Sequence, residues 1–334
     1  MSFENVFTHG NLVDLNISMW SGERKLQPED LGLESKDLSG IFSLGRKKLV
    51  PSHVIEKMRR LDSKARDCLI KNSVSFEFGG ARFVPKKRFL DFVEGVEKII
   101  EEFNREADSI SENYTKYKLE VRKEYVEAAS TAYERLSTLH KGLDVDKNTF
   151  INNFLERIDK AYPSASEIRS KYRMEYVVFQ AALPDLSRAS YDDIIEESEK
   201  VKLLEEVYRK SLYNRVNSFI EKTLTSQREK ATGVLKGFLD RLTSDKVIYE
   251  PAVNLVKDMI VEYEKMDFIG DTEFTNKLKN FKRQSLDIYK ANDFRSNTKL
   301  RESVSDQIRI LINDSLDRDI INEISYQYRM KIKL

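Results

Sequence analysis

The stretch that decides the fold class runs from Phe89 to Leu139. It begins Phe89-Leu-Asp-Phe-Val-Glu-Gly-Val96 and ends Ala132-Tyr-Glu-Arg-Leu-Ser-Thr-Leu139. Apolar or small side chains recur every three or four residues, with a mean spacing of about 3.6 residues, which is the period of an α-helix. One helix of this length would extend roughly 75 Å at ~1.5 Å per residue. It needs a long packing partner, because an exposed apolar face of that size would self-associate.

A second long helical pattern, from about Tyr191 to Leu242, is the partner that the sequence offers. Its middle, Thr223 to Lys230, is polar, so either the seam is loosely specified there or the helix breaks and bends. We therefore expect a mainly α protein, an elongated antiparallel hairpin or bundle of long helices. The heptad-like seam is equally compatible with a coiled coil between two copies, so a homo-oligomer stays open.

Shorter helical patterns lie between and after the two long ones. Asn148–Tyr162 and Ile168–Leu183 read as helices at the tip of the hairpin, with Tyr176-Val-Val-Phe179 as the most apolar turn of the second. Further helices are predicted over Pro251–Met266, Asp271–Ala291 and from Asn297 to the C-terminus.

The N-terminal residues follow a different pattern. Leu12–Ile17 alternates as a short strand does, a helix opens at Pro51-Ser52 and ends near Asn72, and Val74–Val84 reads as a β-hairpin around Gly79-Gly80. We expect three regions: a small cap with a β-hairpin (1–85), the long helical hairpin with its tip (86–246), and C-terminal helices that pack on the bundle (247–334).

Composition fits a helical protein with a charged surface. The chain of 334 residues is 40% hydrophobic and 34% charged, with 12 Gly and 6 Pro. Because 57 basic and 56 acidic residues leave a net charge of +1, no global field attracts nucleic acid or an anionic membrane. Cys68 is the one cysteine, which fits a reducing compartment. The segment Met1–Gly10 lacks a signal pattern, and no apolar run approaches the ~20 residues of a membrane span, so we expect a cytoplasmic protein.

The sequence carries no recognisable catalytic, metal or cofactor motif. His9, His53 and His140 stand far apart, without a second metal ligand at helical or turn spacing. Gly79-Gly80 is followed by Ala-Arg-Phe-Val, which favours a hairpin turn over a phosphate-binding loop. Paired carboxylates lie on apparent helix surfaces beside basic residues. We therefore expect a protein that is not an enzyme and binds no metal or cofactor.

Basic residues gather in the N-terminal quarter and are the candidate nucleic-acid contacts. They are Arg46, Lys47, Lys48, Arg59, Arg60, Lys86, Lys87 and Arg88. If the neighbouring Phe76, Phe78 and Phe83 were exposed, bases could stack on them. The alternative is that these phenylalanines face the core and the charges lie at helix ends.

The N-terminal third also resembles a known family in the order of its short motifs. These are Met19-Trp20-Ser-Gly22 with Lys25-Leu26, Glu29-Asp-Leu-Gly32, Leu44-Gly-Arg-Lys-Lys-Leu49, and the hairpin Phe76–Pro85. Over roughly Leu12–Tyr125 the chain resembles an uncharacterised bacterial and phage family, a domain of unknown function found on mobile elements. The resemblance implies genes encoded beside a MoxR-type AAA+ ATPase and a von Willebrand A-domain protein, and hence an adaptor or substrate-recruiting scaffold.

Three functional hypotheses follow. The first is a non-enzymatic helical scaffold or adaptor that binds a partner protein, such as an AAA+ ATPase. The second is a DNA- or RNA-binding accessory protein of replication or recombination that uses the basic clusters. The third and remotest is a membrane-active helical toxin.

Overall fold

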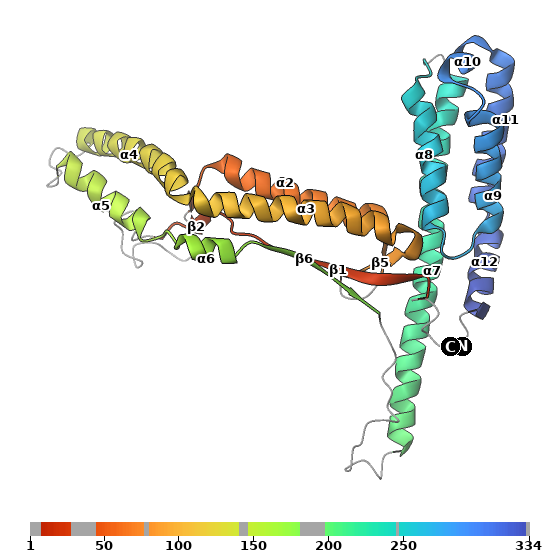
Figure 1. Ribbon diagram of the computed structural model, residues 1–334, viewed down its shortest axis with the longest axis horizontal. Helices are drawn as coiled ribbons and strands as arrows, with labels where there is room; N and C mark the ends of the chain where they lie inside the picture. The colour runs from red at the N-terminus through yellow and green to blue at the C-terminus, as the bar shows by residue number, and fades with distance from the viewer. Residues whose placement is uncertain are drawn as a thin grey trace. The chain divides into compact units, whose positions relative to one another are not determined.

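The computed structural model describes residues 8–27, 45–76, 80–139, 146–180, 198–244 and 247–331. These residues are mainly helical and include a small sheet with the expected β-hairpin, which confirms the fold class (Figure 1). Their internal contacts divide the chain into two units. The α7 unit comprises residues 1–14, 69–93 and 177–334, and the α4 unit comprises residues 15–68 and 94–176. The division into three consecutive domains stays a prediction.

The α7 unit is built on one long helix and the helices that cover it. Helix α7 (Ser198–Thr243) packs against α8 (Glu250–Met266), α11 (Thr298–Ser315) and α12 (Arg318–Lys331), as Figure 1 shows. The partner expected for this segment was region 86–139, but these C-terminal helices cover its buried face instead. Leu235 and Phe238 of α7 belong to the resulting apolar core.

The polar stretch 223–230 does not break α7, which is continuous through it. Thr223, Gln227 and Arg228 are buried there, and Arg228 forms an ion pair with Asp271 inside the unit. A buried ion pair therefore specifies how α7 packs at residues 223–230, where the polar sequence predicted weakly specified packing or a break. The segment contains neither Pro nor Gly, so nothing in it interrupts the backbone hydrogen bonds.

Four strands form the small sheet in the order β4-β5-β1-β6. They are β1 (Gly10–Ser18), β4 (Val74–Ser75), β5 (Arg82–Pro85) and β6 (Arg173–Phe179). The antiparallel pair β4 and β5 is the expected hairpin, with Val74 opposite Phe83, and Gly80 adopts a φ of 90° that a side chain would disfavour. Phe83 packs against Phe219 of α7 with ring centroids 5.4 Å apart.

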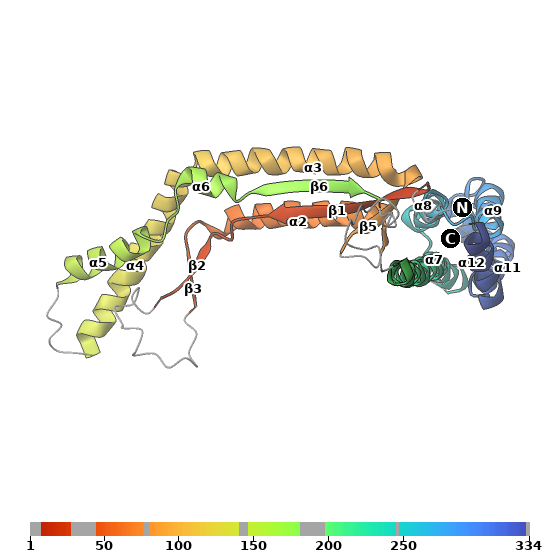
Figure 2. The same cartoon turned by 90° about the horizontal axis from the view of Figure 1, so that it is seen from below.

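The α4 unit contains most of two neighbouring helices, α2 (Ser52–Asn72) and α3 (Lys86–Glu112), which run side by side in Figure 2. Ion pairs join them, among them Lys64 to Glu102 at 3.5 Å. The remaining helices of the unit are α4 (Tyr114–Leu139), α5 (Lys147–Asp159) and α6 (Ala165–Ser170).

The single helix predicted over 86–139 is divided into α3 and α4 at Asn113. The side-chain amide of Asn113 donates to the carbonyl oxygen of Ser109 at 2.9 Å, a local bond of the kind that competes with the helical backbone. Backbone bonds from Asn113 to Ser109 and from Tyr117 to Asn113 persist, so the chain bends without unwinding. The apolar period continues across the bend, which is why the sequence pattern did not reveal it.

The helix predicted over 168–183 is wrong beyond Ser170, because α6 ends there and β6 follows. The segment Arg173-Met-Glu-Tyr-Val-Val-Phe179 is rich in β-branched and aromatic residues, which favour a strand. Ile168 and Tyr172 happen to continue a helical spacing into Tyr176. Residues 181–197, which include the start of the second long pattern, lie outside the described residues.

The C-terminal region has shorter helices than expected. The pattern at 271–291 becomes α9 (Thr272–Phe281), a π-helical turn η4 (Lys282–Leu286), and the start of α10 (Ala291–Ser296). The pattern from Asn297 divides into α11 and α12 after Ser315. Among the described helices, none combines the length and the apolar character that a membrane crossing requires.

Candidate nucleic-acid interface

Two short strands of the α4 unit form a separate ribbon, β2 (Glu23–Lys25) with β3 (Arg46–Lys48). They pair antiparallel, and backbone bonds close both ends: Leu26 donates to Gly45 at 2.9 Å and Leu49 to Gly22 at 2.8 Å. We call these six residues the basic ribbon, because five of them are Arg or Lys.

The ribbon places like charges opposite each other. Arg24 lies opposite Lys47, and Lys25 lies opposite Arg46. Such cross-strand pairs destabilise a sheet, whereas opposite charges stabilise it. The carboxylate of Glu23 offsets part of this repulsion, at 3.6 Å from the guanidinium of Arg46, and the charge of Arg24 also attracts the carboxylate of Glu167. Basic residues therefore outnumber acidic residues along the ribbon, and an anion would be attracted to it.

The ribbon is held in place by its flanks. Leu49 and Val50 after β3 are buried, and the Lys48 ammonium donates to the hydroxyl of Ser52 at 2.8 Å. The phenol of Tyr125 on α4 donates to the carbonyl oxygen of Lys48 at 2.8 Å. These contacts fix the backbone, from which the side chains of Arg24, Lys25, Arg46 and Lys48 are exposed.

A hollow of about 340 Å³ lies beside the ribbon. Five cations line it, and none of the described lining residues is acidic: Arg24, Lys25, Gln27, Lys47, Arg157, Lys160 and Ala161. Arg157 belongs to the last turn of α5, and Lys160 is its C-cap. The negative end of a helix dipole attracts cations, which explains part of this cluster but none of the charge on the ribbon.

Two carboxylates that are close to Arg157 and Lys160 in sequence form ion pairs. Asp159 pairs with Lys118 at 3.2 Å and with Arg122. Glu156 pairs with Lys160 at 2.8 Å, and this contact lowers the pKa of its carboxyl. Glu156 therefore offsets the charge of Lys160, whereas the carboxylate of Asp159 is bound by cations of α4.

The ribbon and hollow suit phosphate groups. Arg and Lys contact phosphate oxygens through charge-assisted hydrogen bonds, and such contacts provide most of the affinity for nucleic acid without reading its sequence. A two-stranded β-ribbon also fits the major groove of B-form DNA.

The structure places the predicted contact residues in different surroundings. Arg46, Lys47 and Lys48 form β3, with Lys47 buried at 6% exposure. Arg59 and Arg60 are exposed on α2 in the same unit.

Lys86, Lys87 and Arg88 begin α3 in the α7 unit, and the last two have structural roles there. The Lys87 ammonium donates to the carbonyl oxygens of Glu264 and Asp267 at 3.4 and 3.5 Å. Arg88 is 2% exposed and pairs with Glu262, which removes it from any surface for a nucleic acid.

The aromatic platform proposed for base stacking does not form from Phe76 and Phe83. Both are buried, and Phe76 packs edge to face on Phe219 at 4.6 Å between ring centroids. They belong to the core, which was the alternative interpretation, and Phe78 lies outside the described residues.

The sequence reasoning missed Arg24, Lys25, Arg157 and Lys160 as site residues. The dipeptide Arg24-Lys25 resembles many surface pairs, and three-residue strands are too short to show a period. Segment 147–160 could be connected with the ribbon only through the packing of α5 against α4.

His9 and His53 pack against aromatic rings. In the described part of the chain, no group of three or more His, Cys, Asp or Glu could hold a metal ion. The His9 ring lies 5.9 Å from that of Tyr328, and burial together with Lys86 lowers the pKa of His9. His53 packs edge to face on Tyr117, and His140 lies outside the described residues.

A family model described as "Protein of unknown function (DUF3150)" matches residues 10–279. The chain belongs to the DUF3150 family. The match covers the basic ribbon, α7 and α8, and so extends well beyond the N-terminal motifs that carried the resemblance. Helices α10 to α12 lie outside the DUF3150 match. Neither a curated protein nor a solved structure gives a significant match to this DUF3150 chain.

Proposed function

We propose that this DUF3150 protein binds nucleic acid through the basic ribbon and is not an enzyme. The observation that carries the proposal is the positive hollow, where ribbon and α5 supply five cations and no carboxylate among the described lining residues. The like-charged pairs Arg24–Lys47 and Lys25–Arg46 support it, because a ribbon selected for stability alone would alternate its charges.

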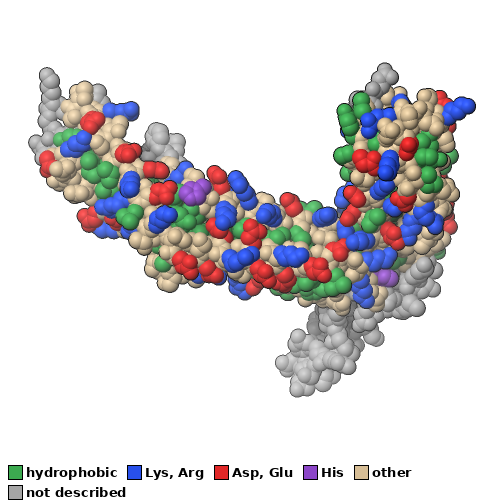
Figure 3. Space-filling view, turned by 45° about the horizontal axis from the view of Figure 1, so that its top comes forward, with side chains coloured by type: hydrophobic (Ala, Val, Ile, Leu, Met, Phe, Trp, Pro, Cys, Tyr) green, Lys and Arg blue, Asp and Glu red, His purple; other side chains and the backbone are tan. Residues whose placement is uncertain are grey.

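Binding of this kind depends on local charge. The net charge of the chain is +1, and on the face shown in Figure 3 acidic and basic side chains are interspersed. Long-range steering by the whole molecule is therefore weak, and affinity depends on cations gathered at one place.

Duplex DNA is the favoured form of nucleic acid. The major groove of B-form DNA is about 12 Å wide and admits a two-stranded ribbon, whereas that of A-form RNA is deep and narrow. We further propose that the protein is an accessory of DNA replication or recombination on a mobile element, and this step rests on the family resemblance alone.

The test is fluorescence anisotropy with a labelled 20-base-pair duplex over a salt series. The ribbon variant is Arg24→Gln/Lys25→Gln/Arg157→Gln. The matched control is Lys98→Gln/Lys116→Gln/Lys123→Gln, which removes the same charge from exposed helix positions of the same unit. We expect the wild type to lose affinity steeply with salt, and the slope of log K against log salt to fall by about 0.9 for each phosphate contact removed.

Two results would contradict the proposal. One is the absence of salt-sensitive binding by the wild type at about 50 mM salt, where phosphate contacts are strongest. The other is an equal loss of affinity in the ribbon and control variants, because this would assign the effect to net charge.

The scaffold or adaptor role is the second candidate, and the long continuous α7 with its covering helices favours it as an extended platform. A MoxR-type AAA+ ATPase is the partner that the resemblance suggests. Native mass spectrometry of the tagged protein from its own host distinguishes the two. A protein recovered in fixed stoichiometry and insensitive to nuclease supports the scaffold, whereas nuclease-sensitive DNA alone supports the first proposal.

A further inference from the structure

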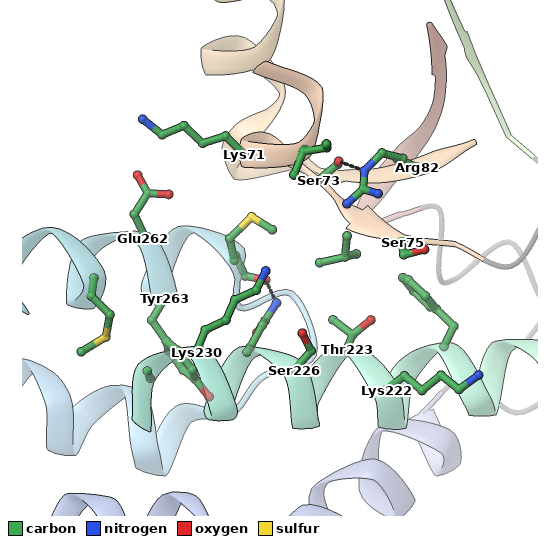
Figure 4. A pocket seen from close by; sticks show the side chains of 17 residues that line it. Lys71, Ser73, Ser75, Arg82, Lys222, Thr223, Ser226, Lys230, Glu262 and Tyr263 are labelled. Carbon is green, nitrogen blue, oxygen red and sulfur yellow. Dashed lines mark hydrogen bonds between the residues drawn. The ribbon is translucent and has the colours of Figure 1, made fainter. Parts of the chain in front are cut away.

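A second cavity, of about 440 Å³, lies wholly within the α7 unit (Figure 4). Its walls come from the end of α2, the β4–β5 hairpin, α7 and α8. This volume is in the range of small-molecule sites, about 300–1,000 Å³. The basic ribbon belongs to the other unit.

Basic residues outnumber acidic ones in the described lining of the cavity. Four cations line it, Lys71, Arg82, Lys222 and Lys230, and Glu262 is the one acidic residue among the described lining. Glu262 already pairs with Arg88, so its charge is offset from outside the cavity.

Arg82, on β5, is the cation that the sheet contributes to the cavity lining. Its Nε donates to the hydroxyl of Ser73 at 2.6 Å, which fixes the guanidinium on the sheet side of the cavity. The residue is partly buried, and no described carboxylate pairs with it, so burial lowers its pKa without an opposing acidic contact. A partly desolvated guanidinium without a counter-ion is an energetic cost that a bound anion would remove.

Helix α7 presents a complementary polar face. Lys222, Ser226 and Lys230 are four residues apart and therefore share one side of the helix. In Figure 4 the Lys230 side chain rises from α7 into the cavity toward the side that holds Arg82. The guanidinium of Arg82 and the ammonium of Lys230 can each donate hydrogen bonds to an anion in the cavity.

One part of the lining is apolar, although Ser73, Thr223 and Gln227 are among its other members. Val74 of the hairpin and Met259 and Met266 of α8 contribute to it. Methionine thioethers make favourable contacts with aromatic rings and adapt to their shape. The site therefore combines an anion-binding end with a surface for a flat ring.

We infer that this cavity binds a nucleotide, with the phosphates between Arg82 and Lys230 and the base against the methionine wall. A nucleotide unites the two features the cavity offers, an anionic group that takes a bidentate guanidinium and a planar ring of limited size. The role is binding, and no chemical step on the nucleotide is implied.

The test is isothermal titration calorimetry of the full chain with ADP, and with adenosine and inorganic phosphate as partial probes. We expect saturable binding of ADP with a Kd below about 1 mM, and weaker binding of both fragments. Lys230→Glu should weaken ADP binding at least about tenfold, because it replaces a phosphate donor by a like charge. Arg82→Lys should weaken it less, because it keeps the charge and loses the bidentate geometry.

Lys236→Glu is the matched control, since Lys236 is an exposed lysine of α7 outside the cavity lining. It and the ribbon variant should bind ADP as the wild type does. The inference is overturned if the wild type shows no saturable ADP binding, if adenosine binds as tightly as ADP, or if Lys236→Glu weakens binding as much as Lys230→Glu. Loss of DNA binding by Lys230→Glu without any ADP signal would assign the cavity to DNA and also overturn it.

Discussion

Arg228 and Asp271 form a bidentate ion pair in the interior of the α7 unit. The Nε and Nη2 atoms of Arg228 lie 2.7 and 2.8 Å from the two carboxylate oxygens of Asp271, and the side chains are 2% and 1% exposed. The phenol of Tyr263 donates to the same carboxylate at 2.6 Å, and the third nitrogen of Arg228 donates to the carbonyl oxygen of Asp314 at 3.1 Å. This network connects α7 with α8, the start of α9 and the end of α11.

Removal of one partner should be strongly destabilising. Arg228→Met leaves the Asp271 carboxylate buried without its counter-ion, so we expect a loss of about 3–5 kcal/mol in the free energy of unfolding. The triple variant Arg228→Met/Asp271→Leu/Tyr263→Phe removes all three polar side chains of the network, and should recover most of that loss. Urea unfolding measures both.

Arg309→Met is the control for this series. It breaks an exposed pair with Asp306 on α11, and should change stability by less than about 1 kcal/mol. If Arg228→Met lowers the free energy of unfolding by no more than Arg309→Met does, the prediction is wrong, and the buried ion pair contributes no more to stability than the exposed one.

Buried tyrosines should make the protein sensitive to alkali. Burial raises the pKa of Tyr114 to about 12, and its phenol donates to the carbonyl oxygen of Pro163 at 3.0 Å. Between pH 10 and about 12 the unfolded chain loses this proton while the folded chain keeps it, so stability falls as pH rises through that window. Below pH 10 the contribution is fully present.

Tyr114→Phe tests the tyrosine effect. It should cost about 1 kcal/mol at pH 8, where the hydrogen bond is lost, and should make the decline above pH 10 shallower. Urea unfolding at pH 8, 10 and 11 provides the comparison. An unchanged alkaline slope in the variant would mean that Tyr114 ionises equally in both states.

The sequence predicted those helices and strands whose pattern, cap or turn residues lie within the element itself. Helices α2 and α8 were predicted from an apolar face and a proline at the start, and the β4–β5 hairpin from its glycine turn. Strand β6 was missed because a short helix ahead of it continues a helical spacing, and its strand character then depends on its place in the sheet with β1.

Contacts between residues that are far apart in the sequence could not be predicted from local patterns. Arg228 and Asp271 are 43 residues apart, and nothing in the polar stretch around Arg228 indicates which carboxylate it will meet. Half of the basic ribbon, at Arg46–Lys48, was noticed as a cluster of charge. Its other half became visible only when the register placed Arg24 opposite Lys47.

Gly22 should be essential to the position of the ribbon. Its φ is 69°, and an added Cβ would lie 2.7 Å from the Ile55 side chain and 2.8 Å from that of Val50. We expect Gly22→Ala to destabilise the protein by about 1–3 kcal/mol and to weaken DNA binding, because β2 would have to move.

Gly45 at the other end of the ribbon is the matched control. Among the described residues, none apart from its chain neighbours has an atom within 4 Å of an added Cβ, and its φ is not positive, so Gly45→Ala should be neutral or slightly stabilising. Urea unfolding and anisotropy with the same duplex measure the two properties. Equal effects of the two alanines would show that neither the backbone conformation nor the close contacts of Gly22 matter.

The like-charged pair Arg24–Lys47 should lower the stability of the protein and increase its affinity for DNA. Arg24→Glu converts it into an opposite-charge cross-strand pair, which should stabilise the protein by about 0.2–1 kcal/mol. The same change places a carboxylate in the hollow and should weaken DNA binding well beyond the loss caused by Lys98→Glu, an identical charge reversal on an exposed position of α3. Thermal unfolding and anisotropy on the same preparations give both values. If Arg24→Glu stabilises the protein but binds DNA as tightly as Lys98→Glu does, the ribbon has no role in DNA binding. If it stabilises the protein and binds DNA more weakly than Lys98→Glu, the repulsion within the ribbon serves the binding of an anionic partner.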